Sequence, residues 1–281
     1  MENAKIAEIL RSSGFRFNKA LGQNFIFDAN LLAAIAADSG VGKADTVVEI
    51  GTGAGTLTAK LAERAARVFS FEVDEHLKPV LDLTLRGIDN VEVVFRDIMK
   101  MRDAEVQDVI GDGEFSVVAN LPYYITTPLI MRFIESALPV RSLTVMVQKE
   151  VADRLRAACG TADYSAVTVA VEMFGDAEVT RVVDRQMFRP APNVDSAVVH
   201  ISRVPGRVAQ EDAAFVKRVV RAAFGMRRKT LANNLSAAFG MPKAKAAELI
   251  TECGFSADVR GERLSLDDFV TLSKAISSAQ S

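Results

Sequence analysis

Two short stretches about seventy positions apart carry residue types that could hold a cofactor and a flat ring. The first is the run E-I-G-T-G-A-G at residues 49–55, which indicates a strand followed by a glycine turn that opens a helix. Such a turn lets backbone N–H groups approach a cofactor closely. The second is Asn120-Leu121-Pro122-Tyr123, where an amide, a proline and an aromatic ring can hold a heterocycle and hydrogen-bond its exocyclic amine. Together they indicate that an amino group on a base is modified.

Polar residues fall at the ends of four successive predicted strands, at Glu49, Glu72, Asp97 and Asn120. Their separations are 23, 25 and 23 residues, about one strand and helix each. The carboxyl ends of strands form the ligand crevice of an open α/β sheet, so we expect these groups to line one cleft. Glu72 is placed to accept hydrogen bonds from two ribose hydroxyls, and Asp97 to reach the amino group of an adenine.

The glycine run lacks the third glycine of the dinucleotide fingerprint, because position 56 is Thr56. The remaining G-x-G-x-G pattern, with Glu49 ahead of Gly51 and Gly53, fits S-adenosylmethionine better than NAD. A glycine loop alone could also be a plain tight turn. The series of four strand ends favours the cofactor site.

Strands and helices alternate from Thr46 onward, which predicts a parallel sheet covered on both faces. The expected strands are residues 46–50, 68–73, 91–95, 115–119 and 143–147. Two later β-rich runs, 166–174 and 197–201, predict an antiparallel pair that closes one edge of the sheet. Beyond Pro205 only helices are expected, at residues 210–224, 228–239, 243–253 and 266–276. The predicted domains are therefore a catalytic domain, 1–205, and a small all-α domain, 206–281.

The composition indicates a globular protein, with 281 residues of which 49% are hydrophobic and 25% charged. No apolar run approaches the roughly 20 residues of a membrane span. Residues 1–13 predict a charged amphipathic helix without the apolar core of a secretory signal, so a cytoplasmic location is expected. Cys159 and Cys253 are 94 positions apart with no C-x-x-C, and the zinc-deaminase motifs are absent. We expect no metal.

A basic stretch stands out in a chain whose net charge is only −2. Between Ala213 and Leu235 there is no acidic residue. The basic residues of this stretch are Lys217, Arg218, Arg221, Arg227, Arg228 and Lys229. The stretch could bind RNA phosphates, or it could be an ordinary solvated helix face.

Residues 120–123 resemble the (Asp/Asn)-Pro-Pro-aromatic motif of methyltransferases that act on exocyclic amines, in the N-L-P-Y form of the KsgA/RsmA-type rRNA adenine N6,N6-dimethyltransferase family. The resemblance extends over nearly the whole chain. Further matches to this family are K-A-L-G-Q-N-F at 19–25, F-R-P-A-P-N-V-D-S-A-V at 188–198, and R-K-T-L with N-L at 228–235. Tyr124 stands where many relatives have Asn.

The resemblance implies a Rossmann-like S-adenosylmethionine-dependent methyltransferase sheet, mostly parallel with an antiparallel edge. It implies methyl transfer to N6 of two adjacent adenosines in the 3′-terminal hairpin loop of small-subunit (16S) rRNA. The expected partner is this rRNA within a small ribosomal subunit or its precursor, and the protein is expected to be a monomer. The cofactor contacts that the resemblance implies are Asn24, Ile26, Gly51, Glu72, Asp97 and Asn120.

The residue chemistry agrees with methylation of an amine. The Asn120 oxygen and the Leu121 or Pro122 carbonyl could accept N6 protons, so that positioning and preorganised acceptors replace a strong base. A base flipped out of its stack could be clamped between Tyr123 and Phe188.

Two alternatives remain open. One is a large-subunit rRNA adenine methyltransferase of the macrolide-resistance type, which usually has Ile at the position of Leu121 and is more basic. The other is a non-catalytic ribosome-assembly factor on the same fold. Loss of Asn120 or of the glycine loop would be expected in such a factor, and both are intact here.

Overall fold

The computed structural model describes residues 8–9, 24–226 and 228–280. Of the expected N-terminal helix, only Glu8 and Ile9 are described; the rest, with residues 19–23 of the K-x-x-G-Q-N-F element, lies outside the described part. The strands are β1 Phe25–Ile26, β2 Thr46–Ile50, β3 Arg67–Glu72, β4 Val91–Phe95, β5 Phe115–Asn120, β6 Val140–Gln148, β7 Gly175–Val183, β8 Phe188–Arg189 and β9 Ser196–Arg203.

The α-helices alternate with the strands in the first part of the chain and follow one another in the last part. They are α2 Ala29–Asp38, α3 Thr56–Ala62, α4 Lys78–Thr84, α5 Asp103–Ile110, α6 Tyr123–Ile134, α7 Lys149–Leu155, α8 Ala166–Phe174, α9 Gln210–Ala223, α10 Leu231–Phe239, α11 Lys243–Glu252 and α12 Leu266–Gln280. Short 3₁₀ helices are η2 Glu75–Leu77, η3 Ile98–Lys100, η4 Arg185–Met187 and η5 Gly261–Arg263.

Within the described residues, seven strands form one sheet in the order β4-β3-β2-β5-β6-β9-β7. The pairs from β4 through β6 are parallel, and β9 pairs antiparallel with β6. Strand β2 lies between β3 and β5, so the chain changes direction across the sheet at this point. Ligands bind at such switch points, beyond the carboxyl ends of the strands. The predicted fold class, mostly parallel with an antiparallel edge, is confirmed.

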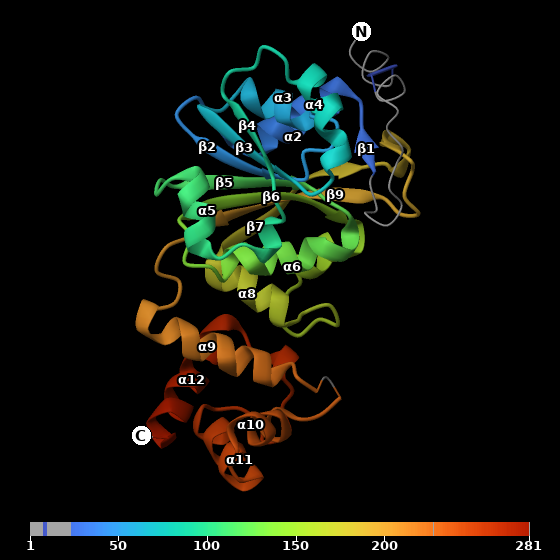
Figure 1. Cartoon of the computed structure of the whole chain (residues 1–281). Helices are drawn as coiled ribbons and strands as arrows, with labels where there is room; N and C mark the ends of the chain where they lie inside the picture. The colour runs from blue at the N-terminus through green and yellow to red at the C-terminus, as the bar shows by residue number, and fades with distance from the viewer. Residues whose placement is uncertain (1–7, 10–23, 227, 281) are drawn as a thin grey trace. The chain divides into compact units, whose positions relative to one another are not determined.

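Helices cover both faces of this sheet. Figure 1 shows α2, α3 and α4 on one face and α5 and α6 on the other. On the first face, Leu32 and Leu61 pack in one core with the buried strand residues Val47 and Val118. Because β2 is buried on both faces, it is a nearly continuous apolar run, with Glu49 as the exception.

The strand predicted at residues 166–174 is wrong, because these residues form helix α8. Their β-branched side chains favour a strand, but Ser165 and Thr168 form a capping box, and Val169 is buried in a helical core. Tertiary packing therefore overrides the local propensity. The strand is instead β7. Its charged side chains give it no apolar strand pattern in the sequence, as is common for a strand at a sheet edge.

The chain divides into two compact units, residues 1–152 with 178–203 and residues 153–177 with 204–281. The division after residue 203 lies close to the expected one, but residues 153–177, expected in the first domain, group with the second unit. Tyr164, at 1% exposure, explains this grouping, because it packs against Phe224 and belongs to the core formed with α9, α10, α11 and α12.

Asn234 ties the helices of the second unit together. The side chain is buried, and its Nδ2 donates to the carbonyl of Ala223, the last residue of α9, at 2.6 Å, and to that of Met226, beyond the helix, at 3.3 Å. Its Oδ1 has no partner among the described residues. The carbonyl bonds satisfy groups that a helix end leaves unpaired.

We expect Asn234→Ala to lower the free energy of unfolding of this unit by about 1–3 kcal/mol, because it leaves a buried carbonyl unpaired. Thermal and urea unfolding measure the change. Asn233→Ala is the matched control, since this less buried neighbour donates to Thr230 within its own helix cap. Equal stability of the Asn234→Ala protein and the parent would contradict the assigned role.

Candidate functional site

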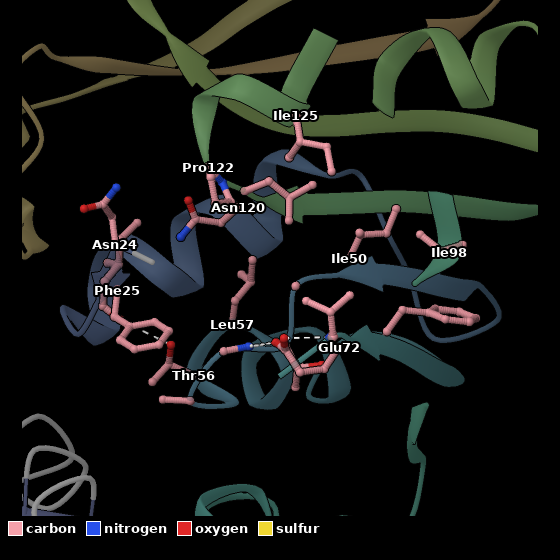
Figure 2. Close-up of a pocket in the computed structure, with 18 of the residues that line it drawn as sticks. Asn24, Phe25, Ile50, Thr56, Leu57, Glu72, Ile98, Asn120, Pro122 and Ile125 are labelled. Carbon is pink, nitrogen blue, oxygen red and sulfur yellow. Dashed lines mark hydrogen bonds between the residues drawn. The ribbon is translucent and has the colours of Figure 1, made fainter. Parts of the chain in front are cut away.

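An open pocket lies at the carboxyl edge of β2, β3, β4 and β5, where the switch point predicts a ligand site. Figure 2 shows Asn120 and Pro122 on one side of it and Glu72 on another, with Asn24 and Phe25 on a third. The predicted site residues that line the pocket are Asn24, Ile26, Gly51, Gly53, Glu72, Asp97, Asn120, Leu121, Pro122, Tyr123 and Phe188.

The glycine loop packs against Leu121, just after β5, and against Phe25 in β1. Gly51 has φ +81°, and a Cβ there would lie 2.7 Å from Leu121 Cδ2. Gly53 has φ +55°, and a Cβ there would lie 2.7 Å from Phe25 Cε1. A residue with a side chain would be strained in this backbone conformation, and its Cβ would force the neighbouring side chain to shift.

Residues 24–26 and 188 reach the pocket through strand pairing. Phe25 pairs with Arg189 and Ile26 with Phe188 in the antiparallel β1–β8 pair. The Thr56 hydroxyl, at the start of α3, donates to the Ile26 carbonyl at 3.2 Å. Two segments more than 160 positions apart thus form one wall.

Glu72 joins the glycine loop to the end of β3. One carboxylate oxygen accepts from the Gly53 N–H at 2.9 Å, and the other accepts from the N–H groups of Val73, at 2.8 Å, and Asp74, at 2.9 Å. Burial raises the pKa of Glu72, while these three backbone donors act in the opposite direction. The carboxylate therefore fixes the loop while it also lines the pocket.

Asp97 follows β4 and is the N-cap residue of η3. Its Oδ1 accepts from the Met99 N–H at 3.0 Å, and its Oδ2 lies 3.2 Å from the exposed Lys100 ammonium. This local cap holds the Asp97 carboxylate at the pocket wall next to Ile98.

The Asn120 side chain lines the pocket at the end of β5 and makes no hydrogen bond to another described residue. The next carbonyl, of Leu121, has no such bond either. The Pro122 carbonyl instead accepts from the Ile125 N–H, at 3.1 Å, and the Thr126 hydroxyl, at 3.3 Å, in the first turn of α6. Two acceptors, one side-chain and one backbone, therefore remain at adjacent positions.

The two predicted aromatic residues differ in their surroundings. Tyr123 is half-buried, and its hydroxyl lies 2.7 Å from Ser196 Oγ on β9. Burial raises the pKa of Tyr123. Phe188 is 1% exposed and belongs to the core beneath the sheet face that α2 covers.

Comparison with known proteins adds to this geometry. The family model described as ribosomal RNA adenine dimethylase matches residues 14–277. Ribosomal RNA small subunit methyltransferase A of Bacillus mycoides is 44% identical over 278 residues, which cover 96% of this chain and 94% of the relative. The chain belongs to the ribosomal RNA adenine dimethylase family. The predicted family and the expectation of a methyltransferase enzyme are thereby confirmed.

Solved structures agree with this membership. A dimethyladenosine transferase from Plasmodium falciparum is similar with a TM-score of 0.74 and 26% identity, over 88% of this chain and 95% of that one. The 23S rRNA methyltransferase ErmE is similar with a TM-score of 0.68 and 25% identity, over 90% and 99%.

Glu49 is the one residue predicted to bind the cofactor that does not line the pocket. It is 1% exposed, and its Oε2 accepts from Thr58 Oγ1 at 2.6 Å and Ser70 Oγ at 2.5 Å. Ser70 Oγ also lies 2.7 Å from Oγ1 of Thr52, a pocket residue. Glu49 thus supports the glycine loop from behind through hydroxyl groups.

Sequence reasoning missed several lining residues, and most of them follow a strand end that it had identified. They include Thr52, Thr56, Val73, Ile98, Met99 and Ile125. The positions just after Glu72 and Asp97 were the available signal, since a chain that leaves a strand end must first pass the crevice.

The predicted RNA-binding residues lie in the second unit. Lys217, Arg218 and Arg221 are on α9, and Arg228 and Lys229 precede α10. Arg218, Arg221, Arg228 and Lys229 are exposed. The Arg218 guanidinium lies over the Phe239 ring, 4.6 Å from its centre. Arg227 is outside the described residues.

Within residues 8–9, 24–226 and 228–280, no cluster of three or more His, Cys, Asp or Glu side chains could hold a metal ion. The helices in the same part of the chain include none long and apolar enough to cross a membrane.

The Glu49 carboxyl generates a pH prediction. Burial, and secondarily the charge of Glu72, raises the pKa of Glu49 from 4.5 to about 7. The folded protein thus retains a proton that the unfolded chain releases near pH 4.5, so this group lowers stability progressively as pH rises from 4.5 to 7. Relative to that of the parent, the free energy of unfolding of Glu49→Gln should rise by up to about 3 kcal/mol between pH 5 and pH 8.

Chemical unfolding at several pH values measures this gain. Any constant cost of the new amide shifts the whole stability curve equally, so only the change of the difference with pH is compared. The exposed Glu114 provides the control variant, Glu114→Gln. Parallel stability curves for Glu49→Gln and the parent would show that Glu49 is charged in the folded protein throughout this range.

Proposed function

We propose that this protein transfers methyl groups from S-adenosylmethionine to N6 of two adjacent adenosines in the 3′-terminal hairpin loop of 16S rRNA. The observation that carries the proposal is the pair of acceptors at Asn120 and Leu121, which have no hydrogen-bond partner among the described residues and border the pocket. An amine with two protons fits this pair.

The pocket residues fit S-adenosylmethionine. Gly51 and Gly53 let the loop that lines the pocket pack closely against Leu121 and Phe25, and Glu72 and Asp97 offer carboxylate oxygens for ribose hydroxyls and an adenine amine. Asn24 and Ile26 would close the wall that β1 forms. When bound, S-adenosylmethionine supplies a methyl group that is activated on a sulfonium.

Adenine N6 is a weak nucleophile because its lone pair is delocalised into the ring. Asn120 Oδ1 and the Leu121 carbonyl would each accept one N6 proton and favour an amine-like nitrogen. The Pro122 carbonyl is less suited, since it already accepts two bonds at the start of α6. Catalysis then depends on positioning and on acceptors preorganised for positive charge at N6, without a strong base or a metal.

The target base must leave its stack to enter the pocket. Tyr123 presents a half-buried ring held by Ser196, and we assign it the stacking face. Phe188, at 1% exposure, supports the wall on the other side of the base.

The small-subunit target is supported by the 44% identity to a small-subunit methyltransferase over most of both chains. ErmE, a 23S rRNA methyltransferase, shares 25% identity. We propose that the enzyme acts as a monomer on the small subunit or its precursor, in the cytoplasm where that RNA is found. The intact Asn120 and glycine loop favour catalysis over a purely structural assembly role.

Asn120→Ala tests the chemistry. The variant should fold and bind small subunits, but lose at least about two orders of magnitude in methyl transfer, as expected for a preorganised contact made mainly in the transition state. Labelled S-adenosylmethionine and undermethylated small subunits, followed by mapping of the modified nucleosides, give the rate and the site. Asn30→Ala, at an exposed position on α2, is the control.

Two results would contradict this proposal. A folded Asn120→Ala protein that dimethylates adenosine at the parental rate would remove Asn120 from the chemistry. Label from the parent enzyme that appears only in large-subunit RNA would favour the macrolide-resistance type of activity.

The basic residues of the second unit are proposed to contact RNA phosphates. Reversing Arg228 and Lys229 to Glu should weaken subunit binding and make it less dependent on salt, because fewer counterions are released. Affinity for S-adenosylmethionine should not change. Lys243→Glu, at an exposed lysine on α11, is the matched control. Unchanged binding of the double variant at several salt concentrations would make the stretch a solvated surface.

A further inference from the structure

Tyr124 is an exposed aromatic residue at the rim of the pocket. Its side chain is 65% exposed, yet it is one of the lining residues. Of the large hydrophobic residues that are exposed in the described part of the chain, Tyr124 is the one with an aromatic ring. Its hydroxyl makes no hydrogen bond to another described residue, whereas the adjacent Tyr123 is held by Ser196. The proposed chemistry of the target base leaves Tyr124 without a role.

The backbone beneath Tyr124 is fixed. Pro122 precedes the first turn of α6, and its carbonyl accepts from Ile125 and Thr126 on the far side of Tyr124. The ring is therefore presented from a rigid helix start, directly after the residues proposed to hold the target base. A rigid aromatic face beside an open pocket is suited to stacking on a base, which needs no hydrogen-bond partner.

We propose that Tyr124 stacks on the nucleobase next to the target adenosine while the target occupies the pocket. The inference rests on the proposed function. When one base leaves a stacked strand, its neighbour loses a stacking partner, and an aromatic side chain can replace that partner. With two adjacent adenosines as substrates, one of them would be the stacked neighbour while the other is methylated.

A cycle that changes both partners tests this contact. Small subunits are reconstituted with 16S rRNA that carries either the normal adenosine or an abasic nucleotide beside one target adenosine. Methyl transfer to that target is measured as kcat/KM for the parent, Tyr124→Phe and Tyr124→Ala. Calorimetry with S-adenosylmethionine is run in parallel on each protein.

On intact RNA, Tyr124→Ala should lower kcat/KM about tenfold, the size of one aromatic–base stack, while Tyr124→Phe stays within about twofold of the parent. On the abasic RNA, Tyr124→Ala and the parent should be equal within about twofold, since the stacking partner is gone. Cofactor affinity should be the same for all three proteins.

Several results would overturn the inference. They are an unchanged rate for Tyr124→Ala on intact RNA, an equal loss on both RNAs, a loss in Tyr124→Phe as large as in Tyr124→Ala, and a loss of cofactor affinity. A parent enzyme that methylates no adenosine in intact subunits would overturn the proposed function, and this inference with it. If the parent enzyme methylates the adenosines but the effect of Tyr124→Ala is the same on intact and abasic RNA, only the stacking inference is overturned.

Discussion

The glycine loop approaches two other segments of the chain so closely that a Cβ at either glycine would force a neighbouring side chain to move. Gly51 faces Leu121, and Gly53 faces Phe25, each where a Cβ would come within 2.7 Å. Because interiors are close-packed, these contacts fix the distances among three stretches that are far apart in sequence. The pocket wall, and the orientation of the Asn120 segment toward it, depend on this packing.

Two buried carboxyl groups hold the loop on its other sides, by different means. Glu72 accepts three backbone N–H bonds at the end of β3, whereas Glu49 accepts two hydroxyl bonds beneath the loop and has an unpaired oxygen among the described residues. Ser70, which lies beside Glu49 in the parallel β2–β3 register, carries the contact on to Thr52. A buried carboxyl without a full set of donors is expected to favour its neutral form.

The positions of the parallel strands and the polar groups at their ends could be predicted because buried parallel strands leave strong apolar runs with one polar residue at the edge. Helix α8 could not be predicted in place of a strand, since the β-branched run at 166–174 is helical only through its cap and its burial against other helices. Spacing placed Glu49 among the pocket groups, but strand alternation turns its side chain beneath the loop. The pairing of β1 with β8 depends on contacts across more than 160 residues and has no local signal.

Cofactor affinity in Gly51→Ala, Leu121→Ala and the double variant, measured by calorimetry with S-adenosylmethionine, tests the central role of this packing. Gly51→Ala should weaken binding at least about tenfold, because a Cβ adds both a collision and left-handed backbone strain. Adding Leu121→Ala should restore part of the affinity, because it removes the colliding methyl group but not the strain. Parental affinity in Gly51→Ala, or losses that simply add in the double variant, would contradict the account.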